Sequence, residues 1–242
     1  MDTYTKPFAW SYSALTNFEN CPKKYYEYAV AKNVKEPEND NMRWGYQVHE
    51  AMAKRLIYGR ELPESMASFE PWARFALTNP SAQTILKTEQ KLAITVDGKP
   101  CEFFDKVHTP WCRAVLDVLK MRGNVARIID WKTGKHPKYD DSLDNAKMQL
   151  VIGAALTMVH YPKVDTVLCQ LIYLQEDTEQ SVKNRSEEVH RIDLPHIWRT
   201  LAPRVQHMSE AILNSDYPPK PSGLCKKHCA VVACPYHGRS NR

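Results

Sequence analysis

Residues 115–119 read V-L-D-V-L, residues 128–134 read I-I-D-W-K-T-G and residues 148–155 read M-Q-L-V-I-G-A-A, and these stretches decide the fold. The first two are apolar runs that predict buried strands. Side chains alternate along a strand, so Asp130 and Lys132 should project from one face. A carboxylate in a buried strand is costly unless it is paired or bound to a metal ion. We therefore expect Asp117 and Asp130 to bind a divalent cation, although D-x-K in an exposed strand would be an ordinary solvated pair.

The rest of the chain has the pattern of an α+β protein. Apolar periodicity predicts helices at 42–58, 64–77, 143–159 and 194–213, after a short helix that Ser13 would cap and that ends at Asn20. Strand patterns cover 89–96, 101–108, 112–120, 125–131 and 165–174, with one more strand within 181–192. Strands in the middle with helices around them predict an α/β/α arrangement, in which a mixed central sheet has helices on both sides.

We expect a single domain over residues 1–242. Its parts would be a helical N-terminal part (1–80), a sheet and helix that carry the site (81–175), and a C-terminal strand, helix and cysteine-rich tail (176–242). The net charge of +5 suits a polyanionic partner. No apolar run approaches the roughly 18 residues of a membrane span. The N-terminus also lacks the basic start and apolar core of a signal peptide. We therefore expect a cytoplasmic protein with no membrane partner.

Four segments, in this order, resemble the PD-(D/E)XK nuclease superfamily in its RecB-type branch. They are S-Y-S-A-L-T-N-F-E-N-C-P-K-K-Y-Y-E-Y at 11–28, W-G-Y-Q-V-H-E-A-M at 44–52, Asp117 with D-W-K-T-G at 130–134, and Gln149 at the start of a helix. The resemblance implies a restriction-endonuclease-like core that hydrolyses DNA phosphodiesters. A fifth segment, C-K-K-H-C-A-V-V-A-C-P-Y-H at 225–237, resembles the iron–sulfur members, which include CRISPR-associated exonucleases and AddB-type helicase-nucleases.

The resemblance also implies a metal site. His49, Asp117 and Asp130 would bind the ion, and the backbone carbonyl of Trp131 would be a further ligand. Oxygen ligands favour Mg²⁺ or Mn²⁺, and the single imidazole leans toward tolerance of Mn²⁺. Lys132 would position the attacking water or stabilise the phosphate, where negative charge develops.

Three further residues belong to segments near this pattern. In similar nucleases the residue at Gln149 contacts DNA or the catalytic lysine, and a tyrosine follows four positions later. Position 153 is Gly here, so we expect no aromatic contact from this helix. Glu50 follows His49 directly and cannot share its helix face. Glu89 would serve either the site or the protein surface.

The C-terminal cysteines have the spacing C-x3-C-x4-C, which is typical of a metal centre in a chain without disulfides. Cys225, Cys229 and Cys234 need a fourth ligand, and Cys21 is the natural candidate. The four could hold an iron–sulfur cluster of the 4Fe-4S type, or zinc with help from His228 or His237, or remain free thiols. A bound centre would clasp the tail to the first helix.

The sequence thus favours a metal-dependent DNA nuclease, an exonuclease on DNA ends or single strands. Recombination, repair or phage DNA metabolism would be its setting, and binding would be largely neutral to sequence. No G-x-x-x-x-G-K-[ST] motif is present to power unwinding, so recombination or helicase proteins, or further copies of the chain, are the partners to consider. The alternatives are a non-catalytic DNA-binding or assembly subunit with this fold, and a zinc-stabilised adaptor with incidental acids.

Overall fold

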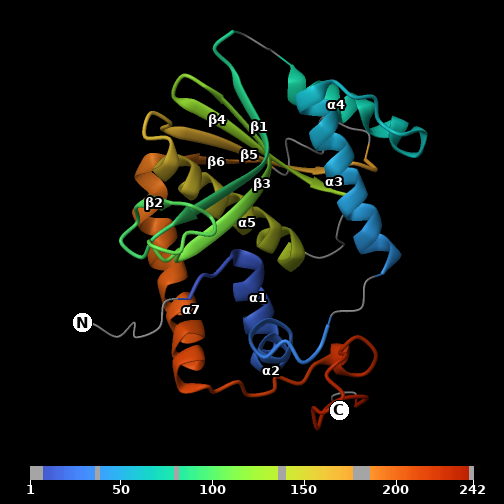
Figure 1. Ribbon diagram of the computed structural model, residues 1–242, viewed down its shortest axis with the longest axis vertical. Coiled ribbons are helices and arrows are strands. Elements are labelled where there is room, and N and C mark those ends of the chain that lie inside the picture. The colour runs from blue at the N-terminus through green and yellow to red at the C-terminus, as the bar shows by residue number, and fades with distance from the viewer. Residues whose placement is uncertain (1–7, 36–38, 79–81, 136–139, 177–185, 240–242) are drawn as a thin grey trace. The chain divides into compact units, whose positions relative to one another are not determined.

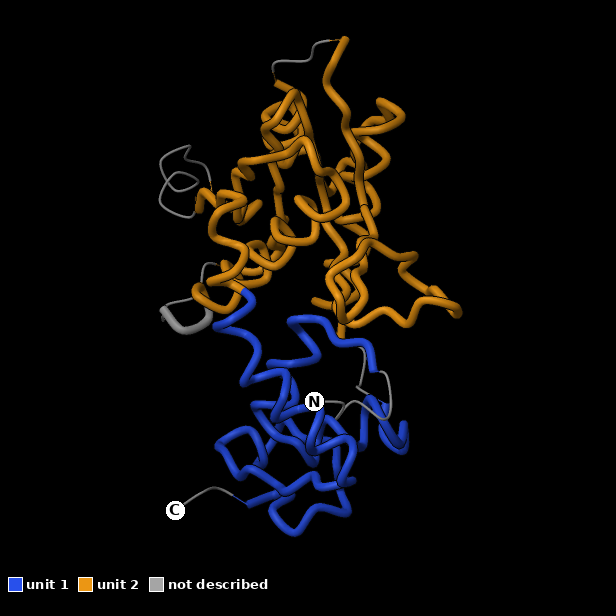
Figure 2. The backbone as a smooth tube through the Cα atoms, turned by 90° about the vertical axis from the view of Figure 1, so that its left-hand side faces the viewer, with its two compact units in different colours: residues 1–38, 198–242 blue, residues 39–197 orange. Residues whose placement is uncertain are grey.

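The computed structural model describes residues 8–35, 39–78, 82–135, 140–176 and 186–239. The chain divides into two compact units, drawn in different colours in Figure 2. Unit 1 comprises residues 1–38 and 198–242, and unit 2 comprises residues 39–197. Within the described ranges, no helix has the length and apolarity that a membrane crossing requires.

Unit 2 is built on a mixed six-stranded sheet with the order β2-β1-β3-β4-β5-β6 (Figure 1). Strands β4 and β5 are parallel and every other neighbouring pair is antiparallel. This mixed sheet confirms the predicted α+β class. The strands are β1 (Ile85–Ile94), β2 (Pro100–Cys101), β3 (Cys112–Arg122), β4 (Val125–Lys132), β5 (Thr166–Tyr173) and β6 (Ser186–His190).

Helices cover both faces of this sheet (Figure 1). Helix α3 (Asp40–Tyr58) is capped by the side chain of Asn39 and ends at Gly59, whose φ of 67° suits a residue without a Cβ. Its buried residues pack with the 3₁₀ turn Glu64–Phe69 and helix α4 (Glu70–Leu77) against one face of the sheet. The predicted helix at 64–77 is thus a 3₁₀ turn followed by an α-helix.

The opposite face of the sheet carries α5 (Asp140–His160), which links β4 to β5 as the crossover of a parallel pair. Gly153 explains how closely α5 can approach. A Cβ at this position would lie 2.7 Å from Leu116 Cδ2 and 3.7 Å from Ile128 Cδ1. Any larger side chain at position 153 would therefore push the helix away from the sheet.

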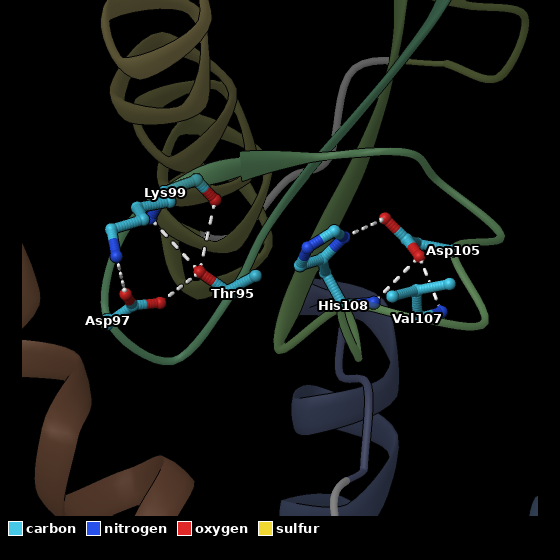
Figure 3. Close-up of polar contacts among 6 residues, drawn as sticks. All are labelled: Thr95, Asp97, Lys99, Asp105, Val107 and His108. Carbon is cyan, nitrogen blue, oxygen red and sulfur yellow. Dashed lines mark hydrogen bonds and ion pairs between the residues drawn. The ribbon is translucent and has the colours of Figure 1, made fainter.

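The predicted strand at 101–108 is wrong, because β2 ends at Cys101 and a loop follows. Asp105 stops the strand: its Oδ1 accepts from the backbone N–H groups of Val107 at 2.7 Å and His108 at 2.8 Å (Figure 3). Such side-chain turns compete with sheet pairing. The loop ends where Trp111 N donates to Ile94 O at 2.7 Å.

Unit 1 contains α1 (Tyr12–Asn20), α2 (Pro22–Tyr25), a π-helical turn (Tyr26–Val30), most of α7 (Leu194–Asn214) and the 3₁₀ turn Gly223–Cys225. Ser11 caps α1 in place of the predicted Ser13, because its side chain accepts from Ala14 N at 3.3 Å. Arg204 of α7 forms two hydrogen bonds with Glu19 of α1, both 2.7 Å long. This bidentate pair ties two segments that lie far apart in the sequence.

Candidate active site

Asp117 is held from two sides in the middle of β3. Its Oδ1 lies 3.2 Å from His49 Nδ1 on α3, and its Oδ2 accepts from the backbone N–H of Trp131 at 2.8 Å. The Trp131 side chain itself is buried in the core beneath α3 and α4. Both carboxylate oxygens are therefore oriented by neighbouring elements, so this acid has a defined direction.

The sheet is irregular where Asp117 lies. Consecutive residues of a regular strand face opposite sides, yet Val118 packs in the core beneath α3 while Asp117 contacts His49 of the same helix. The pairing of β3 with β4 runs from Arg122 as far as the pair Val118–Ile129. Beyond that pair the two strands no longer share a ladder, which leaves the Trp131 N–H free to bond Asp117.

Glu89 lies across from Asp117 on β1. The register pairs Thr88 with Val118 and Gln90 with Leu116, which places Glu89 opposite Asp117. Its φ of 49° is in the left-handed region, which is uncommon for a residue with a long side chain. This conformation costs free energy, and such outliers are concentrated at functional sites.

Asp130 and Lys132 lie near the end of β4, outside the group whose ligand atoms come together, which is His49, Glu89 and Asp117. As expected for alternate residues of a strand, the side chains meet, with Lys132 Nζ 2.7 Å from Asp130 Oδ2. Asp130 is 8% exposed. The ammonium of Lys132 is thus the positive partner of this buried carboxylate oxygen.

The acids of the site repel one another, and the pKa values show it. Burial raises the pKa of Asp130 above its ordinary value; Lys132 opposes this shift and Asp117 adds to it. Burial and the charge of Asp117 also raise the pKa of Glu89. Burial alone would lower the pKa of His49, but its hydrogen bond and charge interaction with Asp117 raise it overall. The pocket therefore favours additional positive charge.

The donor set fits a divalent cation. One ligand atom each from His49, Glu89 and Asp117 lies within 4.8 Å of the others. Carboxylate oxygens with one imidazole nitrogen suit Mg²⁺ or Mn²⁺. The sequence left Glu89 between a site role and a surface role, and the structure brings it to the site. Only the cross-strand register could have revealed this.

Two other residues singled out in the sequence are not part of this donor set. Glu50 forms an ion pair with Lys54 one turn along α3 at 2.6 Å, as a surface residue does. Gln149 is partly exposed on α5, and its side chain makes no hydrogen bond with another described residue. Its predicted contact with DNA or with Lys132 remains a prediction.

The cysteines expected to hold a second centre all lie in unit 1, and each is partly exposed. The Sγ of Cys21 faces two backbone N–H groups, those of Lys24 and Lys220, each at 3.5 Å. Cys225 Sγ likewise lies 3.4 Å from Ser222 N. The tail segment before the cysteine cluster therefore runs beside Cys21.

Comparison with known proteins identifies the family. The model of the PD-(D/E)XK nuclease superfamily matches residues 9–236, and the chain belongs to this superfamily. Members of the superfamily are phosphodiesterases that use divalent metal ions. No curated protein matches the sequence.

Two solved structures match most of the chain. A candidate exonuclease from Eubacterium rectale is 14% identical with a TM-score of 0.50, and the match covers 89% of this chain and 85% of that chain. The crystal structure of SSO0001 is 17% identical with a TM-score of 0.41, over 97% of this chain and 90% of that chain.

Proposed function

We propose that this chain is a divalent-metal-dependent deoxyribonuclease that acts as an exonuclease on DNA ends or single strands. The observation that carries the proposal is the convergence of His49, Glu89 and Asp117 beside the Asp130–Lys132 pair. Membership of the nuclease superfamily supports the reaction class. The fold shared with a candidate exonuclease is consistent with action at ends.

Each residue of the site has a role in this proposal. His49, Asp117 and Asp130 would hold Mg²⁺ or Mn²⁺, together with the backbone carbonyl of Trp131, and Glu89 joins them. When bound, the ion would polarise the phosphate and lower the pKa of a water molecule. The ammonium of Lys132, fixed beside Asp130, would stabilise the charge that develops on the phosphate. Gln149 would contact DNA or Lys132.

We also propose the RecB-type branch as the place of this chain in the superfamily. The order of the four matching segments supports this assignment. The mildly basic chain would bind DNA through its phosphates and with little regard to sequence. Because the family model spans residues of both units, we propose that the whole chain forms one nuclease domain.

Cys21, Cys225, Cys229 and Cys234 are proposed to bind an iron–sulfur cluster. Backbone N–H groups directed at Cys21 Sγ and Cys225 Sγ support this, since such hydrogen bonds accompany thiolate ligands of clusters. A zinc ion, with bonds of about 2.3 Å to sulfur, is the alternative centre for the same residues.

The nuclease proposal is tested with end-labelled DNA in Mg²⁺ or Mn²⁺. Linear single strands and duplexes are compared with circular single-stranded DNA, which has no end. An exonuclease degrades the linear single strand and leaves the circle intact. Cleavage of the circle would contradict the proposed mode, and no cleavage of any substrate with either ion would contradict the proposed activity.

A further inference from the structure

A groove of about 820 Å³ adjoins the proposed metal site. It is lined by Glu89 and Lys91 from β1, by Phe103 and Phe104 from the loop after β2, and by His160 from α5. Glu89 also lines a second groove, together with His49. The first groove is thus continuous with the residues proposed to hold the metal ion.

Two phenylalanines and Lys91 line this groove, and Arg113 lies beside the phenylalanine rings. Phe103 and Phe104 pack edge to face with ring centroids 4.9 Å apart. Lys91 Nζ lies 5.3 Å from the Phe104 ring, and the Arg113 guanidinium lies 5.2 Å from the Phe103 ring. Ala93 pairs with Arg113 and Lys91 with Val115, so Lys91 and Arg113 are diagonal neighbours on one face of the sheet.

Phe104 is open to solvent, with 68% of its surface exposed. A lone exposed apolar residue would need no explanation. This ring, however, is held in place by a partner ring and two cations beside a groove. The loop that carries it is fixed by Asp105, which accepts from two backbone N–H groups and faces the His108 ring at 3.2 Å (Figure 3). Packing alone does not account for a fixed, exposed aromatic side chain here.

On the basis of the nuclease function above, we propose that this groove binds a single-stranded segment of the DNA substrate, with a base stacked on Phe104. Aromatic side chains that stack bases and cations that track phosphates are the usual combination in single-strand binding. Lys91 and Arg113 supply the complementary charge. A paired base already has neighbours on both faces, so the groove selects unpaired nucleotides. Glu102 is the acidic side chain on this wall apart from Glu89, and it is exposed to solvent.

The test measures binding without cleavage, in EDTA at about 0.1 M salt, where phosphate contacts are not fully screened. A labelled single strand and a blunt duplex of equal length are titrated with full-length wild type, Phe104→Leu, Phe104→Tyr and Val107→Ala. Leucine keeps the bulk of Phe104 without its π-face, and tyrosine keeps that face. Val107 lies in the same loop, is 83% exposed and serves as the control. A strand that contains 2-aminopurine reports stacking directly by loss of fluorescence.

We expect Phe104→Leu to weaken single-strand binding about 5- to 100-fold, with loss of the quenching, and to leave duplex binding within about twofold. Phe104→Tyr and Val107→Ala should match wild type. Equal affinity of Phe104→Leu and wild type for the single strand would overturn the proposal, as would equal losses on single strand and duplex. A shift in oligomeric state without a change in single-strand binding would also overturn it, because the patch would then contact a second copy.

Failure of this proposal is separable from failure of the nuclease assignment. If wild type cleaves DNA and binds the single strand, and Phe104→Leu binds the strand equally well, only the stacking role of Phe104 is contradicted. A wild-type protein that neither cleaves nor binds DNA would contradict both.

Discussion

At the scale of single residues, the site depends on Asp117, because neighbouring groups contact both of its carboxylate oxygens. One faces His49 and the other accepts from Trp131 N. A carboxylate oriented in this way loses little conformational freedom when it takes part in metal binding. The same position forces two irregularities, the break in side-chain alternation along β3 and the left-handed backbone of Glu89 opposite.

The backbone of Glu89 gives a prediction about stability. A residue with a Cβ is strained at a φ of 49°, and glycine is not. We therefore expect Glu89→Gly to have a free energy of unfolding about 1 kcal/mol higher than Glu89→Ala, although both lack the carboxylate. Urea denaturation of the two variants measures the difference. If Glu89→Ala proves the more stable of the two, the backbone here is not strained.

The sequence allowed part of this site to be predicted, for physical reasons. Asp117, Asp130 and Lys132 lie in apolar runs, where a charge must have a partner, so the local pattern made them candidates. His49 came from resemblance to a family motif. Glu89 reaches the site through the register between β1 and β3 and through its left-handed backbone. Neither feature can be recognised from a local pattern of residues.

At the scale of elements, both α5 and the α3–α4 pair pack on the sheet through apolar side chains. Helix α5 also makes a close approach at Gly153, and α3 and α4 also share a charged pair. The positions of most helices and strands followed from apolar periodicity. The strand expected at 101–108 failed because its alternating pattern could not reveal the turn that Asp105 makes.

Gly153→Val should lower the free energy of unfolding by about 2 kcal/mol, because the new side chain would overlap Leu116. Thermal and urea denaturation measure the loss. Asp144→Val, at an exposed position of the same helix, controls for the helix propensity of valine and should cost less than about 1 kcal/mol. Equal losses in both variants would mean that the helix does not need the close approach.

The ion pair between α3 and α4 predicts a pH dependence of stability. Arg55 forms two hydrogen bonds with Glu70, at 2.9 and 2.6 Å, and this interaction holds the pKa of Glu70 below its ordinary value of 4.5. A lowered pKa means that the stabilisation is complete above the ordinary pKa and is lost as the pH falls through the folded value. Between about pH 5 and pH 3, wild type should lose more stability than Glu70→Gln. The exposed Glu64→Gln is the control and should follow wild type; parallel curves for Glu70→Gln and wild type would contradict the assignment.

At the scale of the whole molecule, the cysteines offer a test that does not involve cleavage. Protein purified without oxygen should be brown, with broad absorbance near roughly 400 nm, if the proposed iron–sulfur cluster is present. Cys229→Ser should lose the colour and much of the stability, because the cluster would join the tail to Cys21. The buried Cys112→Ser changes a thiol outside the cluster and should keep the colour. If wild-type protein is colourless and holds about one zinc per chain, the centre is zinc and not an iron–sulfur cluster. If wild type is stable without any metal, the proposed clasp is contradicted.

The central claim is that the acids around Asp117, together with Asp130 and Lys132 at the end of β4, catalyse phosphodiester hydrolysis. Single-turnover cleavage of end-labelled single-stranded DNA tests it most directly. Rates are compared in Mg²⁺, Mn²⁺ and EDTA for wild type, Asp130→Asn, Lys132→Met and Glu187→Gln. Glu187 pairs with Lys147 at 2.7 Å and provides a carboxylate control in the same sheet. The cleavage rates of Asp130→Asn and Lys132→Met should each be at least about a hundredfold below that of wild type, because each substitution removes a charge that acts in the transition state. Lys132→Met should still bind Mn²⁺ in calorimetry, Glu187→Gln should cleave as wild type does, and EDTA should abolish cleavage. Cleavage by Asp130→Asn at the wild-type rate, or undiminished cleavage in EDTA, would contradict the account.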